Sequence, residues 1–174
     1  MIKYFEFEGE IEKVETTLNQ LNSNQELNID KIKKLNNERD ELYKKIYSNL
    51  DPWQKVQVSR HGERPHTNDY IQNIFTDVVF LHGDKKYADD NAIVGGLAKI
   101  SDNSIFFIGT EKGNTMETRI KHNFGMAKPE GYRKVQRLIK LAEKFQLPLI
   151  SFVDTAGAFP GKDAEERGQS ESIA

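Results

Sequence analysis

The sequence predicts an α/β protein whose core follows a helical arm, and three observations lead to this prediction. Apolar residues recur at helical spacing through much of the first 50 positions. Two β-rich runs, 93–100 and 105–109, follow one another across a polar turn, as in a β-hairpin. A helix-like segment from 129 to about 146 then leads into a further apolar run, 149–153. This order indicates a ββα-type unit with another strand attached.

Composition restricts the class of protein without identifying it. The 174 residues suffice for one domain, and 37% apolar with 30% charged residues favours a compact core with a solvated appendage. A net charge of −2, with acids and bases interleaved, gives no sign of a nucleic-acid partner. The absence of cysteine excludes disulfides, a thiolate nucleophile and Cys-ligated zinc. No signal sequence or membrane span is evident, so we expect a soluble cytoplasmic protein with no membrane partner.

Residues 1–52 are expected to form a helical hairpin. Its two helices are predicted from apolar stripes: Ile11, Val14, Leu18 and Leu21 in the first, and Ile29, Ile32, Leu35, Leu42 and Ile46 in the second. A polar break at 22–25 separates them, and Asp51-Pro52 ends the second helix because the residue before proline avoids helical angles. No paired acids or histidines converge in this arm, so we expect it to serve assembly.

Residues 53–76 are interpreted as a connecting segment with a short helix near 68–75. His61 and His66 could form a metal pair, but no cysteine or fixed acid pair accompanies them, which favours ordinary loop histidines. Arg60 and Arg64 could bind a phosphate or carboxylate, although a structural ion pair is the commoner role.

The core is expected over residues 77–174. It begins with an apolar run at 78–81 and a polar loop at 84–91, and residues 110–127 are predicted to be loop. Gly95 and Gly96 interrupt a strand, which often marks a bulge or a close backbone approach. The helix starting at Pro129 carries a stripe that we expect to be buried: Tyr132, Val135, Leu138, Ile139, Ala142 and Phe145.

The loop at 154–161 (DTAGAFPG) is the strongest candidate for a functional site. It follows the apolar run 149–153 and precedes an acidic helix start at 163–166. In parallel α/β folds, ligands bind where strands end. Backbone N–H groups at Gly157 and Gly161, with a helix N-terminus behind them, could hold developing negative charge.

Several functions are compatible with such a loop. Asp154 to Gly157 matches the DxxG element of GTPases, but no G-x-x-x-x-G-K-[ST] phosphate loop accompanies it. A hydrolase triad is weakly supported, because Ser151 lies inside the strand and there is no G-x-S-x-G elbow. A backbone oxyanion site for a thioester enolate and a purely structural turn both remain open on the residues alone.

Longer motifs in a fixed order narrow these possibilities. They are 84–96 (DKKYADDNAIVGG), 123–134 (with NFGM and PEGYRK), 154–161 and 164–171 (AEERGQSE). Together with the helical arm and the region around Trp53 and Arg60, they resemble the family of carboxyltransferase alpha subunits of acetyl-CoA carboxylase, of the bacterial and plastid type. The resemblance covers essentially all 174 residues.

The resemblance implies a crotonase-like (ClpP/crotonase) spiral of ββα units behind the helical hairpin. It implies a transferase that moves a carboxyl group from carboxybiotin, on the biotin carboxyl carrier protein, to acetyl-CoA, forming malonyl-CoA for fatty acid biosynthesis. The implied partners are a beta subunit in an α2β2 heterotetramer and the ATP-binding biotin carboxylase complex. Zinc is expected only in the beta subunit, and no metal in this chain.

The sequence departs from the family pattern in two ways. Ala156 replaces a proline, which loosens the loop entry. Nothing corresponds to the family's glycine-rich G-E-G-G-S-G-G oxyanion loop, so we expect an incomplete, truncated core, inactive alone, with no certain catalytic residue. The alternative is an inactive fragment that serves only binding or assembly. The expected substrate-binding residues are Gly157, Ala158, Gly161, Gly95 and Gly96.

Overall fold

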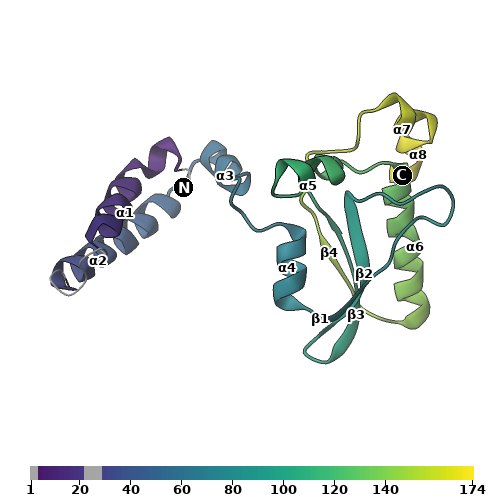
Figure 1. Cartoon of the computed structure of the whole chain (residues 1–174), viewed down its shortest axis with the longest axis horizontal. Helices are drawn as coiled ribbons and strands as arrows, with labels where there is room; N and C mark the ends of the chain where they lie inside the picture. Colours follow the sequence, from purple (N-terminus) through teal and green to yellow (C-terminus); the bar gives the residue numbers. More distant parts are fainter. Residues whose placement is uncertain (1–3, 22–28) are drawn as a thin grey trace. The chain divides into compact units, whose positions relative to one another are not determined.

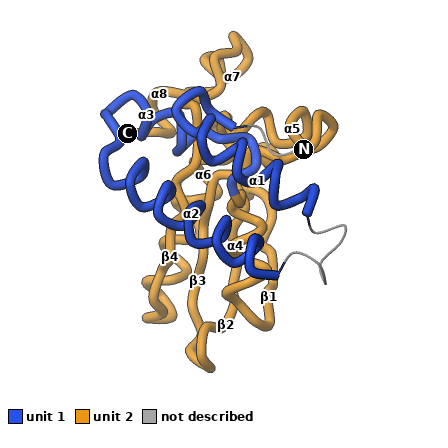
Figure 2. Tube along the Cα trace, turned by 90° about the vertical axis from the view of Figure 1, so that its left-hand side faces the viewer, with its two compact units in different colours: residues 1–64 blue, residues 65–174 orange. Residues whose placement is uncertain are grey.

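The computed structural model describes residues 4–21 and 29–174. The chain forms two compact units, Met1–Arg64 and Pro65–Ala174, which Figure 2 distinguishes by colour. The boundary falls inside the segment expected to connect arm and core. Each unit has its own packed interior.

The first unit contains the two helices that the apolar stripes predict. A short 3-10 turn, Glu6–Glu8, leads into α1 (Gly9–Leu21), and α2 (Ile29–Tyr47) packs against α1. Ile11, Val14 and Leu18 are buried as expected, whereas no residue of α2 is fully buried. The polar break expected at 22–25 lies outside the described residues. The role of this hairpin as an assembly arm stays a prediction.

A third helix of this unit, α3 (Pro52–Ser59), was not predicted from the sequence. The carboxylate of Asp51 accepts the backbone N–H of Gln54 at 2.7 Å, and the Gln54 side chain accepts the N–H of Asp51 at 2.9 Å. This reciprocal pair is a capping box, with proline at the first helical position. Asp51-Pro52 therefore starts a helix, and α2 has already ended at Tyr47.

The second unit is built on a four-stranded mixed sheet in the order β1-β2-β3-β4 (Figure 1). The strands β1 (Thr76–Phe80), β2 (Ile93–Ile100) and β3 (Asn103–Thr110) are antiparallel neighbours. After the helix α6 (Pro129–Phe145), β4 (Leu149–Phe152) joins β3 in parallel. The predicted order of hairpin, helix and strand is confirmed, and the fold class is α/β.

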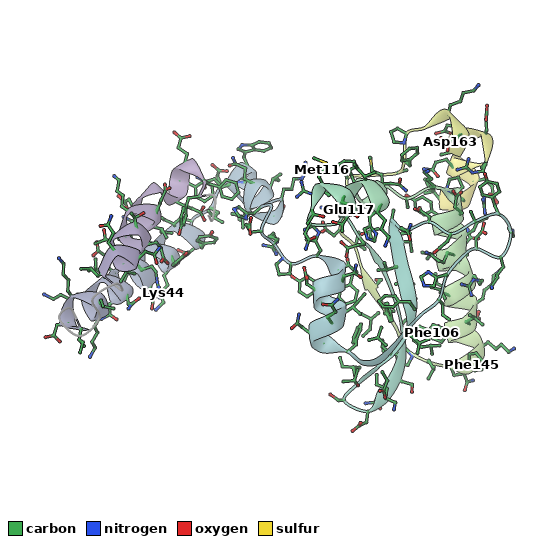
Figure 3. The ribbon with its side chains drawn as sticks, viewed as in Figure 1. Lys44, Phe106, Met116, Glu117, Phe145 and Asp163 are labelled. Carbon is green, nitrogen blue, oxygen red and sulfur yellow. The ribbon has the colours of Figure 1, made fainter. Side chains whose placement is uncertain are left out.

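Helices cover both faces of this sheet. The neighbouring residues Phe106 and Phe107 point to opposite faces because side chains alternate along a strand. Phe107 packs in one cluster with Ile71 of α4 (Thr67–Ile74), and Phe106 packs in another with Leu138 of α6. Figure 3 labels Phe106 in the sheet close to α6. The short helix expected near 68–75 is thus confirmed as α4.

One local prediction was wrong, and two others are confirmed with sharper bounds. The segment 110–127, predicted to be loop, contains α5 (Met116–Lys121), which Thr115 caps by accepting the N–H of Thr118. The helix start expected at 163–166 is confirmed as α7 (Lys162–Glu166), and Gly168, whose φ is +81°, separates it from α8 (Gln169–Ile173). The hairpin turn consists of Ser101 and Asp102, both at positive φ, which matches a tight two-residue turn.

The buried stripe of α6 was predicted only in part. Leu138 and Ala142 are buried and Tyr132 and Val135 partly so, but Ile139 is 43% exposed and Phe145 58% exposed. The helix instead buries Glu130 and Lys134. A polar network under this helix accounts for the difference.

This network joins α6 to the loop at 82–91. The Lys134 ammonium, almost fully buried, donates to the Asp89 carboxylate and to the Asp90 carbonyl at 2.8 Å. The Arg133 Nε donates to Asp84 at 3.1 Å, and the Asp84 carboxylate also accepts backbone N–H groups of residues 86–88. The acidic motif at 84–91 is therefore structural in this fold.

The pKa values of these carboxyl groups follow from their contacts. Burial alone would raise the pKa of Asp84, but the N–H groups of Tyr87 and Lys86 and the Arg133 guanidinium lower it to about 2. At Asp89, burial likewise raises the pKa, but the hydrogen bond from the Lys134 ammonium outweighs this effect. The pKa of Asp89 is therefore also lowered to about 2. Burial prevails at Asp90, whose pKa is raised.

We predict that Asp84→Asn destabilises the second unit at pH 7 by about 1–3 kcal/mol, because the charged acceptor is lost. The folded pKa lies below the unfolded value, so this contribution is present above about pH 4 and disappears as the pH falls toward 2. Urea unfolding followed by NMR signals of this unit at several pH values measures it. Asp102→Asn, in the exposed turn, is the control, and a stability difference that does not change with pH would contradict the prediction.

Candidate functional site

The candidate site lies at the carboxyl ends of the parallel strands β3 and β4. The segments that follow these strands are 111–128 and 153–161, and Figure 1 shows α5 and α7 at this same end of the unit. Ligands of α/β sheets bind at such an edge. The loop predicted from sequence is therefore in a position where it could meet a substrate.

Two threonines hold the loop in place. The Thr110 hydroxyl, at the end of β3, accepts the N–H of Asp154 at 2.6 Å. The Thr155 hydroxyl donates to the Gly125 carbonyl at 2.6 Å and accepts the N–H of Gly157 at 3.0 Å. The loop is thus tied to its neighbours by side chains that the apolar pattern of the strands does not reveal.

A second tie is a backbone pairing between the two segments. Ala158 forms a parallel bridge with Ala127, and the Phe159 N–H donates to the Ala127 carbonyl at 3.0 Å. The Gln169 amide donates to the same carbonyl at 2.9 Å and to the Phe159 carbonyl at 3.0 Å. The loop 154–161 is therefore anchored at both ends.

Charged side chains also meet at this edge. The Lys112 ammonium forms an ion pair with the Asp154 carboxylate, and both side chains remain partly exposed. Nearby, buried Glu111 accepts the N–H groups of Asn68 and Gly113, each at 2.8 Å. His66 Nδ1 lies 3.8 Å from Glu111 and, within the described structure, has no hydrogen-bond partner.

Three residues of this edge were not predicted from the sequence: Thr110, Glu111 and Lys112. His66 was considered only as part of a possible metal pair with His61. The signal of the three missed residues was their position at the end of β3 or directly after it. It becomes visible only once β3 and β4 are known to be parallel neighbours.

The predicted loop residues lie together but differ in environment. Gly157 is exposed at φ +146°, a conformation that L side chains rarely adopt, and a Cβ added there would have no atom within 4 Å. A Cβ at Gly161 would lie 2.3 Å from the Phe159 ring. Because α7 has only five residues, its dipole adds little to the site. Ala158 is half-buried between the two glycines.

Gly95 and Gly96 differ from the loop glycines in environment, because both are buried within β2. A Cβ at Gly96 would lie 2.0 Å from the Val79 carbonyl oxygen, and one at Gly95 would lie 2.5 Å from Leu138. The chain's own atoms occupy the space on that side of each residue. Close packing explains this glycine pair, and a part in substrate binding stays a prediction.

Arg167 belongs to a structural network at the base of α7. Its guanidinium donates to Glu130 at 3.1 Å and to Asp163 at 3.3 Å, and it lies over the Tyr87 ring at 4.9 Å. The hydrogen bond with Glu130 raises the pKa of Arg167. This arginine therefore orients the segment after the loop.

In residues 4–21 and 29–174, no three or more His, Asp or Glu side chains are grouped so that they could hold a metal ion. His61 and His66 belong to different units. Of the helices that the structure describes, none has the length and apolar character needed to cross a membrane.

Comparison with known proteins identifies close relatives of the chain. A sequence model of the family described as acetyl co-enzyme A carboxylase carboxyltransferase-like matches residues 4–174. The acetyl-coenzyme A carboxylase carboxyl transferase subunit alpha of Rhodospirillum centenum is 54% identical over 170 residues, 97% of this chain and 52% of that relative. The same subunit of Francisella tularensis is 49% identical over 176 residues, 99% of this chain and 56% of the relative.

The chain spans about half the length of the curated relatives it matches. Among solved structures, a single-chain, multi-domain long-chain acyl-CoA carboxylase matches 67% of this chain and 12% of its own, with a TM-score of 0.50 and 24% identity. This likeness concerns the fold.

We predict that Gly96→Ala destabilises the second unit by about 1–3 kcal/mol, because the new methyl group would overlap the β1 backbone. Thermal unfolding together with amide exchange of β2 measures the loss. Gly9→Ala is the control, since nothing lies within 4 Å of a Cβ at Gly9. A Gly96→Ala variant as stable as the parent would show that β1 moves away at no cost.

Proposed function

The chain belongs to the acetyl-CoA carboxylase carboxyltransferase family, and from this premise we propose that it forms part of a carboxyltransferase alpha subunit. The enzyme would transfer the carboxyl group of carboxybiotin, on its carrier protein, to acetyl-CoA and so form malonyl-CoA in the cytoplasm. A carboxyltransferase beta subunit, which would carry the zinc, would complete the assembly together with the biotin carboxylase. The family match over residues 4–174 is the observation that carries this proposal.

The fold supports the proposal at the level of one repeating unit. The hairpin β2-β3, the helix α6 and the parallel strand β4 follow in the order of a ββα unit with the next strand added. We propose that this is a turn of a crotonase-like spiral.

The loop 154–161 is the proposed place of contact with carboxybiotin. Gly157, Ala158 and Gly161 would hold the substrate mainly through the backbone, because the loop offers few reactive side chains. When bound, carboxybiotin supplies the carboxyl group. The residues of this chain keep the loop in one conformation: Thr110 and Thr155 hold its first half, and Gln169 holds the carbonyl at Phe159.

The arrangement fits a substrate that approaches the main chain closely. The positive φ of Gly157 presents the backbone without a side chain over it. At the loop entrance the Lys112 ammonium is paired with the Asp154 carboxylate, so these two charges compensate each other.

A binding or assembly module without catalytic activity is the second candidate. The helical hairpin of the first unit favours it, because α1 and α2 form a packed pair with many exposed polar residues. The two candidates differ in whether the loop 154–161 affects turnover.

We predict that Gly157→Val, in the complete alpha subunit assembled with beta subunit and biotinylated carrier, lowers malonyl-CoA formation at least about tenfold. Valine strains the positive-φ position and crowds the substrate. Lys162→Ala is the control in the same loop region: Lys162 is almost fully exposed, so its replacement should change the rate less than about twofold. Transfer of labelled carboxyl groups from carboxybiotin to acetyl-CoA is the measurement.

Equal and small effects of the two substitutions would make the loop a structural turn. If the unsubstituted subunit assembles with its partners but forms no malonyl-CoA, the result supports an assembly module instead. Circular dichroism of both variants distinguishes a local effect from unfolding.

A further inference from the structure

A groove lined by cations lies between the loop at 84–86 and the outward side of α6. Its volume is about 430 Å³, within the range of small-molecule sites. It is lined by Asp84, Lys85, Lys86, Arg133, Gln136, Arg137, Lys140, Leu141 and Lys144. We refer to these residues as the basic groove.

The charge of the basic groove is largely uncompensated. Arg133 is neutralised by Asp84, the one acid of the lining. In the part of the chain that the structure describes, the other five cations form no salt bridge with a carboxylate: Lys85, Lys86, Arg137, Lys140 and Lys144. The whole chain has a net charge of −2, so this positive charge is a local concentration.

The groove follows one line along α6. Arg133, Arg137, Lys140 and Lys144 are spaced by four, three and four residues, so they stand above one another on one side of the helix. Like charges at this spacing destabilise a helix. In the described structure none of the last three forms a salt bridge with an acid of the chain. An anion bound along this line would offset the repulsion among them.

Arg137 is a rigid member of this line. Its Nε donates to the Gly83 carbonyl at 3.0 Å and its Nη2 to the His82 carbonyl at 3.1 Å. These neutral acceptors fix the guanidinium without cancelling its charge. Because a guanidinium has five N–H donors, three remain available to a ligand. The exposed lysines beside it can adapt to different positions of an anion.

We propose that the basic groove binds a small anion that carries two or more adjacent phosphate groups. A fixed arginine with flexible lysines suits the spread negative charge of a polyphosphate. The volume suits a ligand the size of a nucleotide. The lining is on α6 and the 84–86 loop and shares no residue with the loop 154–161, so this inference does not rest on the proposed function.

Isothermal titration of the 174-residue chain with pyrophosphate and with ADP, at about 0.15 M salt, tests the proposal. We expect both to bind with Kd values below about 1 mM and inorganic phosphate to bind at least about tenfold more weakly, because it contacts fewer cations. The double variant Lys140→Gln, Lys144→Gln should weaken pyrophosphate binding at least about tenfold. Both side chains are exposed and make no salt bridge within the described residues, so this variant should fold normally.

Lys44→Gln, Lys45→Gln in α2 is the matched control, because it removes the same charge from exposed positions outside the groove. Figure 3 labels Lys44 on that helix. The control should bind pyrophosphate like the parent.

Three results would overturn the proposal. They are the absence of pyrophosphate and ADP binding, equal weakening in the control and groove variants, and binding of a short DNA duplex much tighter than pyrophosphate that the groove variant abolishes. The last result would assign the groove to nucleic acid.

Discussion

The buried ammonium group of Lys134 is the constraint on which the second unit depends. A charge removed from water is costly unless it is paired and hydrogen-bonded. Lys134 is 2% exposed and satisfies this requirement with the Asp89 carboxylate and the Asp90 carbonyl. The loop at 82–91 is therefore fixed to α6, and the rotation of α6 about its own axis is fixed with it.

The site depends on this arrangement through Asp90. One of its carboxylate oxygens accepts the N–H of Lys128, directly before α6, at 2.7 Å, and the other accepts the Asn123 amide at 3.1 Å. Ala127 lies between these two points and pairs with Ala158 of the candidate loop. The acidic motif thus positions one partner of the loop without itself contacting the loop. With α6 in this orientation, Arg137, Lys140 and Lys144 point outward and line the basic groove.

Local sequence signals predicted much of the fold. The β-hairpin, α4, α6 and the strand β4 follow from apolar periodicity and from proline at the start of α6. The exposed Ile139 could not be predicted in this way, because periodicity assumes that apolar residues decide which side of a helix is buried. In α6 the ion pair of Lys134 with Asp89 also determines which side of the helix is buried. The missed helix α3 had a local signal in the Asp51 capping box, which was interpreted only as the end of α2.

The candidate site was predictable in position but not in composition. A glycine-containing loop after an apolar run indicated the edge of the sheet, and the structure places Gly157, Ala158 and Gly161 there. Thr110 ends β3 and Lys112 follows it, more than 40 residues before the loop, so only the parallel pairing of β3 and β4 reveals them. Gly95 and Gly96 carried a similar glycine signal for a different reason, which is close contact between the chain's own backbone and side chains.

A double-mutant cycle of Lys134→Met and Asp89→Asn measures most directly whether the buried ammonium group organises the second unit. Equilibrium unfolding of the parent, both single variants and the double variant at pH 7 gives the coupling free energy. We expect Asp89→Asn to be strongly destabilised, because it leaves the buried ammonium without its carboxylate partner, and the coupling to reach about 2 kcal/mol or more. Additive effects, with a coupling below about 0.5 kcal/mol, would contradict this role of Lys134.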